Sequence, residues 1–238
     1  MKKRITSLSL LCIACLPLSA AETAIDKATD GEIKFGLEAL TTWRSEYMYR
    51  GFKLADKSME FQLAGQVALS NTETIDIGLY FDTATGDGDF TETGAFFDFS
   101  KNIGDLTYSA KLTLRDYSNS TFKSGADIGG SVNWKLNDNI DFTAFLSYDT
   151  GAEGAYGEIK ATAYKEISTS SYLLFKTGIG ATADYYDRSG LHQLFANLEY
   201  TYNISDNVSV SPFVGTSIGI HDEAPNSLFG GIYFAVSF

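Results

Sequence analysis

The segment Met59–Leu69, MEFQLAGQVAL, decides the fold of this chain because apolar and polar side chains alternate along it. A period of two is the period of a β-strand with two unlike faces. The apolar face carries Met59, Phe61, Leu63, Val67 and Leu69, and the other face carries Glu60, Gln62, Ala64 and Gln66. The segment therefore predicts a strand between a hydrophobic environment and water.

The same alternation continues from Ile33 to Phe238 and predicts twelve strands. The first run carries Phe35 and Leu37 on one face, and we expect it to continue through Trp43 towards Tyr49. The twelve predicted runs are residues 33–49, 59–69, 75–82, 91–100, 106–116, 125–136, 140–149, 156–167, 172–185, 191–204, 208–220 and 227–238.

Short and longer connections alternate between these runs. Five are tight and rich in Asn, Asp, Ser or Gly, which favour hairpin turns, at residues 71–74, 101–105, 137–139, 168–171 and 205–207. Six are longer, at residues 50–57, 84–90, 117–124, 151–155, 186–190 and 221–226. This arrangement predicts an antiparallel up-and-down barrel with both termini periplasmic. Because even the longer loops are short, we expect none to fold into the lumen.

Alternation alone does not separate a membrane barrel from a water-soluble one. About eight strands enclose an interior that side chains can fill, so twelve strands with apolar faces inward would leave a void. Lipid around the apolar face removes that difficulty, although a two-sheet periplasmic sandwich stays open. Aromatic residues favour the membrane barrel because they fall into two girdles. Tyr47, Phe81, Tyr148 and Tyr185 form the loop-end girdle, and Phe35, Phe99, Trp134, Phe142, Tyr200 and Tyr202 form the turn-end girdle.

The first 21 residues have the three parts of a secretory signal. Three cations precede an apolar run from Ile5 to Leu16, and small residues at Ala20 and Ala21 offer a cleavage site. Cys12 and Cys15 lie inside this signal, so we expect no disulfide in the mature chain; a lipid-modified Cys15 is the alternative. We therefore divide the chain into a signal (1–21), a short periplasmic segment (22–32) and an outer-membrane barrel (33–238).

Composition and charge limit the function classes. Tyr, Phe and Gly are abundant (14, 17 and 22) and Pro is rare (3), which suits long strands joined by tight turns. The net charge of −12 is spread along the chain and argues against nucleic-acid partners.

We expect no enzyme and no cofactor. His192 and His221 lack the neighbouring Ser and orienting group that a phospholipase-type barrel needs, so both are interpreted as polar residues of the extracellular rim. Asp87, Asp89 and Glu92 lack the ligand spacing of a calcium loop. His221, Asp222 and Glu223 could hold a divalent ion only weakly, and we predict no metal site.

The polar face supplies the candidate site. Its predicted cations are Lys34, Arg44, Arg50, Lys111, Arg115, Lys135, Lys160 and Lys176. Its predicted anions are Glu38, Glu46, Glu60, Asp76, Glu92, Asp98, Asp127, Asp141, Asp149, Glu158, Glu166, Asp184 and Glu199. Rings of charge set the selectivity of water-filled pores. We therefore predict a weakly cation-preferring channel for small hydrophilic solutes or ions, lined by Arg44, Glu46, Arg50, Glu60, Lys111, Arg115, Asp127 and Lys160. A plugged structural or surface-interaction barrel is the alternative, and the oligomeric state stays open.

The C-terminal residues resemble a known sorting signal. Phe234, Val236 and Phe238 lie on one face of an alternating strand that ends on an aromatic residue. This resembles the signal by which the barrel-assembly machinery captures bacterial outer-membrane proteins, and it implies that machinery and outer-membrane lipid as partners.

A second resemblance lies near the other end. Ser45, Tyr47, Arg50 and Gly51 fit the S-x-Y-x-x-R-G segment of TorF-type porins, also called the Gcw-type family. That family continues with a small polar residue and Gln, where this chain has Phe52 and Lys53. The resemblance implies an outer-membrane porin, in agreement with the strand pattern.

Overall fold

A computed structural model describes residues 34–118, 120–220 and 225–238. The predicted signal, the periplasmic segment and the His221–Glu223 cluster lie outside these described residues. The strands are β1 (Lys34–Arg44), β2 (Tyr47–Tyr49), β3 (Phe52–Ala55), β4 (Ser58–Ala68), β5 (Glu73–Ala84), β6 (Thr91–Ile103), β7 (Leu106–Ser118), β8 (Gly125–Asn137), β9 (Ile140–Asp149), β10 (Gly154–Ser168), β11 (Ser171–Tyr185), β12 (Arg188–Ser205), β13 (Val208–Gly219) and β14 (Ser227–Ser237).

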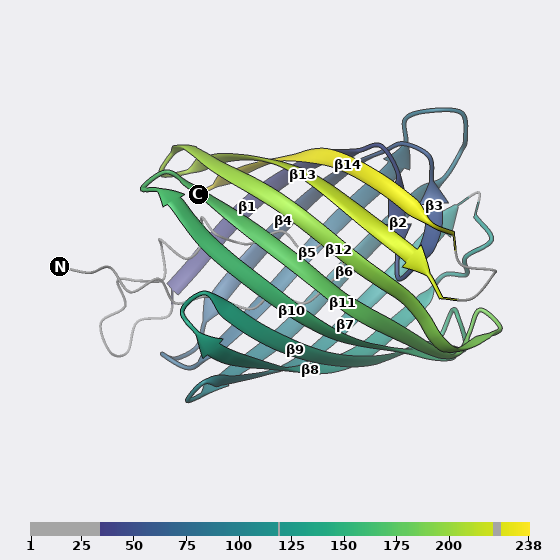
Figure 1. The fold of residues 1–238 in the computed structure, drawn as a ribbon, viewed down its shortest axis with the longest axis horizontal. Helices are drawn as coiled ribbons and strands as arrows, with labels where there is room; N and C mark the ends of the chain where they lie inside the picture. The colour runs from purple at the N-terminus through teal and green to yellow at the C-terminus, as the bar shows by residue number, and fades with distance from the viewer. Residues whose placement is uncertain (1–33, 119, 221–224) are drawn as a thin grey trace.

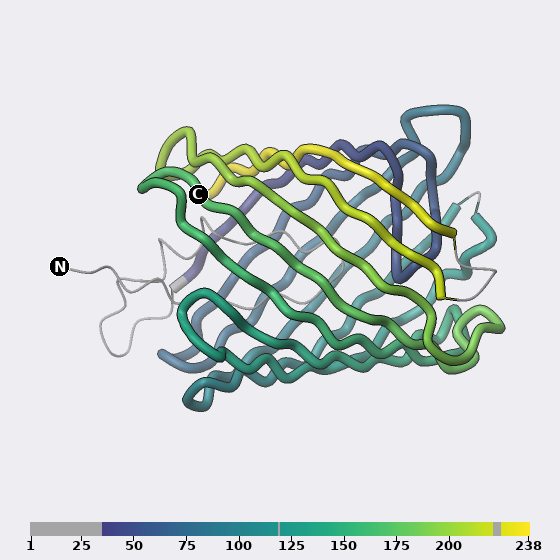
Figure 2. The backbone as a smooth tube through the Cα atoms, viewed as in Figure 1, coloured from purple at the N-terminus to yellow at the C-terminus, as the bar shows by residue number. Residues whose placement is uncertain are grey.

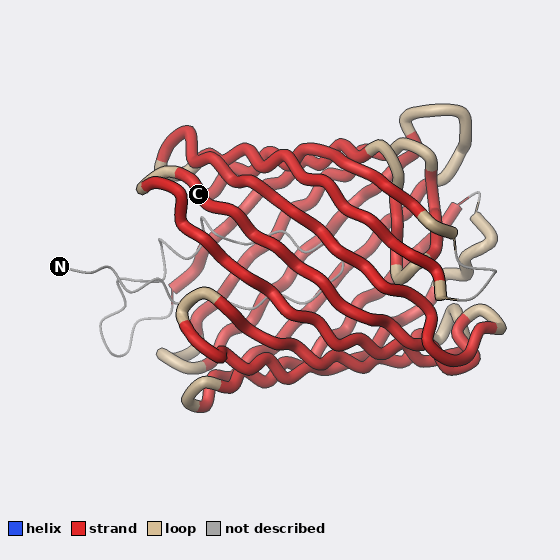
Figure 3. Tube along the Cα trace, viewed as in Figure 1, coloured by secondary structure: helices blue, strands red, loops and turns tan. Residues whose placement is uncertain are grey.

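Twelve of these strands form one closed antiparallel barrel in the order β1-β14-β13-β12-β11-β10-β9-β8-β7-β6-β5-β4 (Figure 1). Each strand pairs with its neighbours along the chain, and β1 closes the barrel against β14, from Glu38 opposite Ser237 to Arg44 opposite Gly231. In the described part of the chain all regular structure is strand (Figure 3), and no helix there could span a membrane. The predicted twelve-stranded up-and-down barrel is confirmed.

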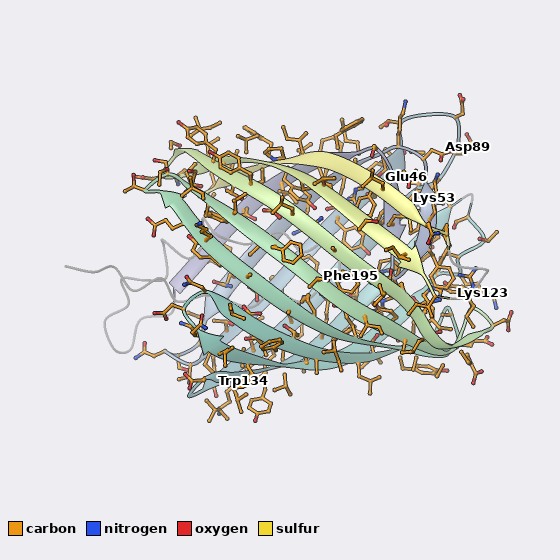
Figure 4. The ribbon with its side chains drawn as sticks, viewed as in Figure 1. Glu46, Lys53, Asp89, Lys123, Trp134 and Phe195 are labelled. Atoms are coloured by element: carbon orange, nitrogen blue, oxygen red, sulfur yellow. The ribbon has the colours of Figure 1, made fainter. Side chains whose placement is uncertain are left out.

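The two faces of the wall are as the alternation predicts. Leu79, Leu146 and Ile159 point outward and are more than 60% exposed, whereas Glu38 and Glu60 point inward and are buried. Near one end of the barrel, Trp134 stands on the outer surface (Figure 4), where its ring stacks on that of Phe142 at 6.1 Å. The apolar exterior and polar interior are what a barrel in lipid requires.

The loop-end aromatic girdle is only half confirmed. Phe81 and Tyr148 are exposed on the outer face, but Tyr47 and Tyr185 are buried inside the barrel. Tyr47 is inside because β1 ends at Arg44 and the chain then leaves the wall. Tyr185 is inside because the β11–β12 register shifts after Thr182, which moves the side chains that follow off the simple alternation.

The prediction that no loop enters the lumen is wrong. After β1 the chain forms a second, two-stranded sheet, β2–β3, in which Tyr49 pairs with Phe52. Arg50 (φ 50°) and Gly51 (φ 80°) form the two-residue turn, and positive φ at both central positions is the conformation that joins tight hairpins. Figure 2 shows this hairpin crossing one mouth of the barrel, transverse to the barrel strands. Tyr47, Tyr49 and Phe52 of this loop are buried inside the barrel. Burial of these aromatic rings stabilises the inward position of the loop.

Candidate functional site

The β2–β3 hairpin spans the lumen from one wall to the opposite wall. It leaves the wall between β1 and β4, which are adjacent in the barrel, and its tip contacts β8, β9 and β11 on the far side. Arg50 makes these contacts: Nη2 donates to Asp127 Oδ2 at 2.6 Å and to Ser147 Oγ at 3.0 Å, and Nη1 donates to the Tyr185 hydroxyl at 3.2 Å. The hairpin therefore divides the lumen, at the end of the barrel with the longer loops, into two compartments.

The base of the hairpin is held by a second set of charges. Arg44 pairs with Glu60 at 2.6 Å and with Asp82 at 2.9 Å, and its guanidinium lies 4.3 Å from the Tyr47 ring centroid. The Tyr47 hydroxyl donates to Glu92 at 2.9 Å. Both ends of the hairpin are thus fixed by buried polar contacts, which favour one docked geometry.

The compartment on the β4–β8 side holds a cluster of buried charged and aromatic side chains. Arg115 lies 3.4 to 3.6 Å from Glu92, Asp127 and Asp149, and its guanidinium is 4.7 Å from the Tyr49 ring centroid. The Tyr80 hydroxyl donates to Glu92 at 2.6 Å. This arginine–carboxylate cluster therefore places paired charges and rings in the lumen on this side of the hairpin.

Aromatic residues cover the hairpin at the mouth of the barrel. Phe52 stacks on His192 with ring centroids 4.8 Å apart and contacts Phe122 and Tyr186 edge-on. The guanidinium of Arg188 lies 4.4 Å from the Phe52 ring centroid. His192, interpreted from the sequence as a polar residue of the extracellular rim, lies near the mouth of the barrel but is only 1% exposed, because Phe52 of the hairpin covers its ring. These contacts add apolar burial to the ionic ties of the hairpin.

Burial also changes the acid–base behaviour of the hairpin. It raises the pKa of the Tyr47 and Tyr49 phenols well above 10, helped at Tyr47 by the negative charge of Glu92. Burial by itself would lower the pKa of Arg50, but Tyr49, Tyr185 and Asp127 raise it above its ordinary value, so Arg50 stays cationic. The docked hairpin thus carries neutral phenols and a permanent positive charge at its tip.

The compartment on the β10–β14 side contains a cavity of about 180 Å³. One side of this cavity is the hairpin, through Met48, Tyr49, Arg50 and Gly51, and the other sides are inward residues of β1 and β10 to β14. Its charged lining residues are three cations, Arg44, Arg50 and Lys176, and three anions, Glu46, Glu158 and Glu199. In Figure 4, Glu46 lies near the loop end and Phe195 lies further along the wall.

Aromatic side chains on the inner wall lean across onto glycines of the neighbouring strand. A Cβ atom on Gly94 would lie 2.2 Å from the Tyr80 ring, one on Gly178 would lie 2.6 Å from Phe195, and one on Gly215 would lie 2.6 Å from Phe229. Each glycine therefore gives space for a ring that lies along the wall instead of projecting toward the barrel axis. This packing keeps the β10–β14 compartment from filling with aromatic side chains.

The eight predicted pore-lining residues fall into three groups. Arg44, Glu46 and Arg50 border the cavity; Glu60, Arg115 and Asp127 belong to the ion-pair clusters; Lys111 and Lys160 are buried on the wall beside Asp98 (3.3 Å) and Glu158 (4.0 Å). Arg50 lies in the turn of the hairpin, at the start of the connection 50–57 predicted from the sequence. Whether these residues line a conducting pore stays a prediction.

Several residues of the site were missed or misplaced from the sequence. Asp82 lies six residues after Asp76 and therefore on the same face of β5, but it was not among the predicted interior anions. Tyr185 was assigned to the outer girdle, although its hydroxyl contacts Arg50 inside the barrel. Asp184 was assigned to the interior, but it is exposed and accepts a hydrogen bond from Ser189. The sequence did contain a signal for the hairpin turn: Gly51 follows Arg50 between the aromatic residues Tyr49 and Phe52.

The predicted sorting signal lies on the outer surface at the end of β14. Phe234 and Phe238 are 45% and 71% exposed, and Val236 between them is partly exposed. The Phe238 backbone amide donates to the Leu37 carbonyl at 2.8 Å, so the terminal residue is tied to β1. Its role as an assembly signal stays a prediction.

Solved structures share this fold at low sequence identity. The KdgM porin matches with TM-score 0.56 and 7% identity, covering 85% of this chain and 99% of that one. A COG4313 outer-membrane channel from Pseudomonas putida F1 matches with TM-score 0.57 and 8% identity (85% and 95% covered). The NanC porin matches with TM-score 0.55 and 11% identity (85% and 98% covered). Neither a protein-family model nor a curated protein sequence matches the chain.

The apolar exterior, the closed sheet and these structural matches define the class: the protein is a twelve-stranded β-barrel of the bacterial outer membrane. Within that class the fold resembles channel porins, although LpxR from Salmonella typhimurium also shares it, with TM-score 0.55 and 8% identity. The narrower resemblance to TorF-type porins stays a prediction. The fold alone does not specify the function, which depends on the side chains of the lumen.

Proposed function

We propose that the protein is an outer-membrane channel through which small hydrophilic solutes or ions diffuse along the β10–β14 side of the lumen. The observation that carries this proposal is the division of the lumen: the hairpin and the arginine–carboxylate cluster occupy one side, and a cavity lies on the other. Wide barrels commonly hold water-filled channels beside loops that fold inward. Likeness in fold to the KdgM porin, one structure of which is described as a complex with disordered oligogalacturonate, supports passage of small solutes.

The charge of the lumen favours a weak cation preference. The wall as a whole carries more carboxylates than cations, but the cavity lining balances three of each. Many interior cations are already neutralised by close carboxylates, as Arg50 is by Asp127. A permeating ion would therefore meet only a small net negative potential, which salt should mask as the Debye length falls from about 10 Å at 0.1 M to about 3 Å at 1 M.

Planar-bilayer recording of the refolded protein tests both statements. We expect ion conductance, together with a small cation-selective reversal potential across a tenfold KCl gradient that shrinks at high salt. Absence of conductance would instead support the plugged structural barrel. Anion preference would show that the charge of the lumen has been misread while leaving the channel intact.

In the same proposal the protein is a non-enzymatic membrane component whose partners are outer-membrane lipid, the barrel-assembly machinery and the permeating solutes. The exposed apolar face of the wall supports the lipid contact. The alternating, aromatic-ended β14 supports recognition by the assembly machinery.

A further inference from the structure

We propose that the cavity on the β10–β14 side is a binding site for uncharged saccharides. This inference rests on the proposed channel, because it names the class of solute that the open compartment favours. The recognition surface is an aromatic strip, defined here as Phe195 on β12, Phe213 on β13, and Phe229 and Tyr233 on β14, all of which line the cavity.

The aromatic strip is built into the wall. Phe195 leans onto Gly178, Phe213 onto Gly231 and Phe229 onto Gly215, each with ring atoms 2.6 Å from where a Cβ atom would stand. Phe213 and Tyr233 stack with centroids 4.5 Å apart. Four rings fixed by close packing along one side of a polar lumen form a preorganised apolar surface, which suits a solute with an apolar face.

Hydrogen-bonding groups border the same surface. Gln193, Asn197, Thr216 and Ser217 line the cavity beside the rings. Ser217 donates to Gln193 Oε1 at 2.9 Å, and Gln193 Nε2 donates to the Tyr156 hydroxyl at 3.1 Å, so the amide is oriented. Rings flanked by amides and hydroxyls match a pyranose, which has apolar C–H faces and a rim of hydroxyl groups.

The charges of the cavity favour a neutral ligand over an acidic or basic one. Three cations and three anions line it, and each of these six charges has an interaction partner within the chain. Arg44 pairs with Glu60, Arg50 with Asp127 and Glu46 with Lys53. Glu158 accepts a hydrogen bond from the Tyr156 hydroxyl, and Glu199 accepts one from Thr201. No surface of one sign is left along the described lining to select a charged solute.

Equilibrium dialysis of detergent-folded protein against radiolabelled maltotriose, as a neutral probe, tests this site independently of conductance. We expect saturable binding that Phe229→Ala and Phe195→Ala each weaken about three- to tenfold, as loss of one aromatic contact predicts. Phe229→Tyr should retain binding because it keeps the ring. Heat-dependent gel migration checks that each variant is folded.

Phe96→Ala is the matched control, because Phe96 leans onto Gly78 in the same way but lies on the β4–β8 side, outside the cavity. It should bind maltotriose like the wild type. The inference is overturned if maltotriose does not bind, if trigalacturonate binds more tightly, or if Phe96→Ala weakens binding as much as Phe229→Ala. Conductance without maltotriose binding would overturn this inference alone, whereas binding without conductance would support it and reject the channel.

Discussion

Arg50 and Asp127 are 77 positions apart in the sequence, yet their side chains meet at 2.6 Å across the lumen, joining the hairpin tip to β8. The contact is buried on both sides, with side chains 4% and 2% exposed. It connects a segment that leaves the wall between β1 and β4 to strands on the far side of the barrel. Several expectations about the channel depend on this pair.

Replacing Arg50 with Ala should release the hairpin and raise single-channel conductance. Removing one partner of a buried ion pair costs on the order of 3–5 kcal/mol. In this protein we expect that cost to destabilise the docked position of the hairpin. Asp127 keeps Arg115 at 3.5 Å, so the barrel itself should stay folded. Conductance and protease cleavage at the hairpin should both increase.

Lys53→Ala is the control for Arg50→Ala, since Lys53 is on the same hairpin but pairs with Glu46 and Asp56 at the exposed edge. Exposed pairs contribute about 0–1 kcal/mol, so this variant should behave like the wild type. Equal effects of the two substitutions would contradict a specific role for the Arg50–Asp127 contact.

Gly51→Ala should also undock the hairpin. A Cβ atom at Gly51 would lie 2.8 Å from the His192 ring, and φ is +80°. Gly104→Ala separates the two effects, because Gly104 also has positive φ (+62°) but no neighbour within 4 Å of its Cβ position. Both variants carry backbone strain of about 1–3 kcal/mol. Only Gly51→Ala adds a clash with His192, so only this variant should change the conductance. An unchanged conductance in Gly51→Ala would mean that the tip is not packed on His192.

Alkaline pH should weaken hairpin docking. Because burial raises the pKa of Tyr47 and Tyr49, the docked state binds their protons more tightly than an undocked hairpin, whose phenols ionise near pH 10. The stabilisation is fully present below about pH 10 and is lost as pH rises above that value. We therefore expect conductance to rise as the pH increases above about 10. The conductance of Tyr49→Phe, which lacks one titrating group, should rise less. A wild-type conductance that does not change with pH would count against the docked hairpin.

Deleting Phe238 should impair insertion into the outer membrane far more than it harms the barrel. The side chain is 71% exposed, so it adds little to packing within the chain, while the sorting resemblance makes it the recognised residue. Cell fractionation should show less protein in the outer membrane, whereas refolded protein should keep its heat-dependent gel migration. Phe238→Tyr should restore insertion by keeping an aromatic end. Equal outer-membrane levels of the truncated and full chains would reject the assembly role.

The barrel could be predicted from the sequence because both the alternation within each strand and the pairing of consecutive strands are local features of the chain. Alternation along Met59–Leu69 fixes which side chains face lipid, and each strand pairs with the next one in the chain. Short turns rich in Asn, Asp and Ser then determine the order of strands without any long-range information.

The divided lumen could not be predicted in the same way, because it depends on contacts between distant residues. Alternation continues from β1 into Tyr47 and Tyr49 with no change of period, although the chain leaves the wall at Ser45. The partners of Arg50 come from three separate strands, and sequence spacing does not specify them. Asp127 appeared in the sequence as one carboxylate among many; only the fold shows that it receives the hairpin.

The transverse hairpin also has a mechanical consequence. A single-layer sheet closed into a cylinder flattens easily, since only its bending stiffness opposes an elliptical distortion. The β2–β3 crossbar connects nearly diametrically opposite strands, through Arg50 to Ser147 on β9 and from its base to β1. Compression along that diameter must therefore deform the hairpin, and extension must break the Arg50 contacts. We therefore expect the same segment that narrows the lumen to oppose flattening of the barrel by lateral pressure from the surrounding bilayer.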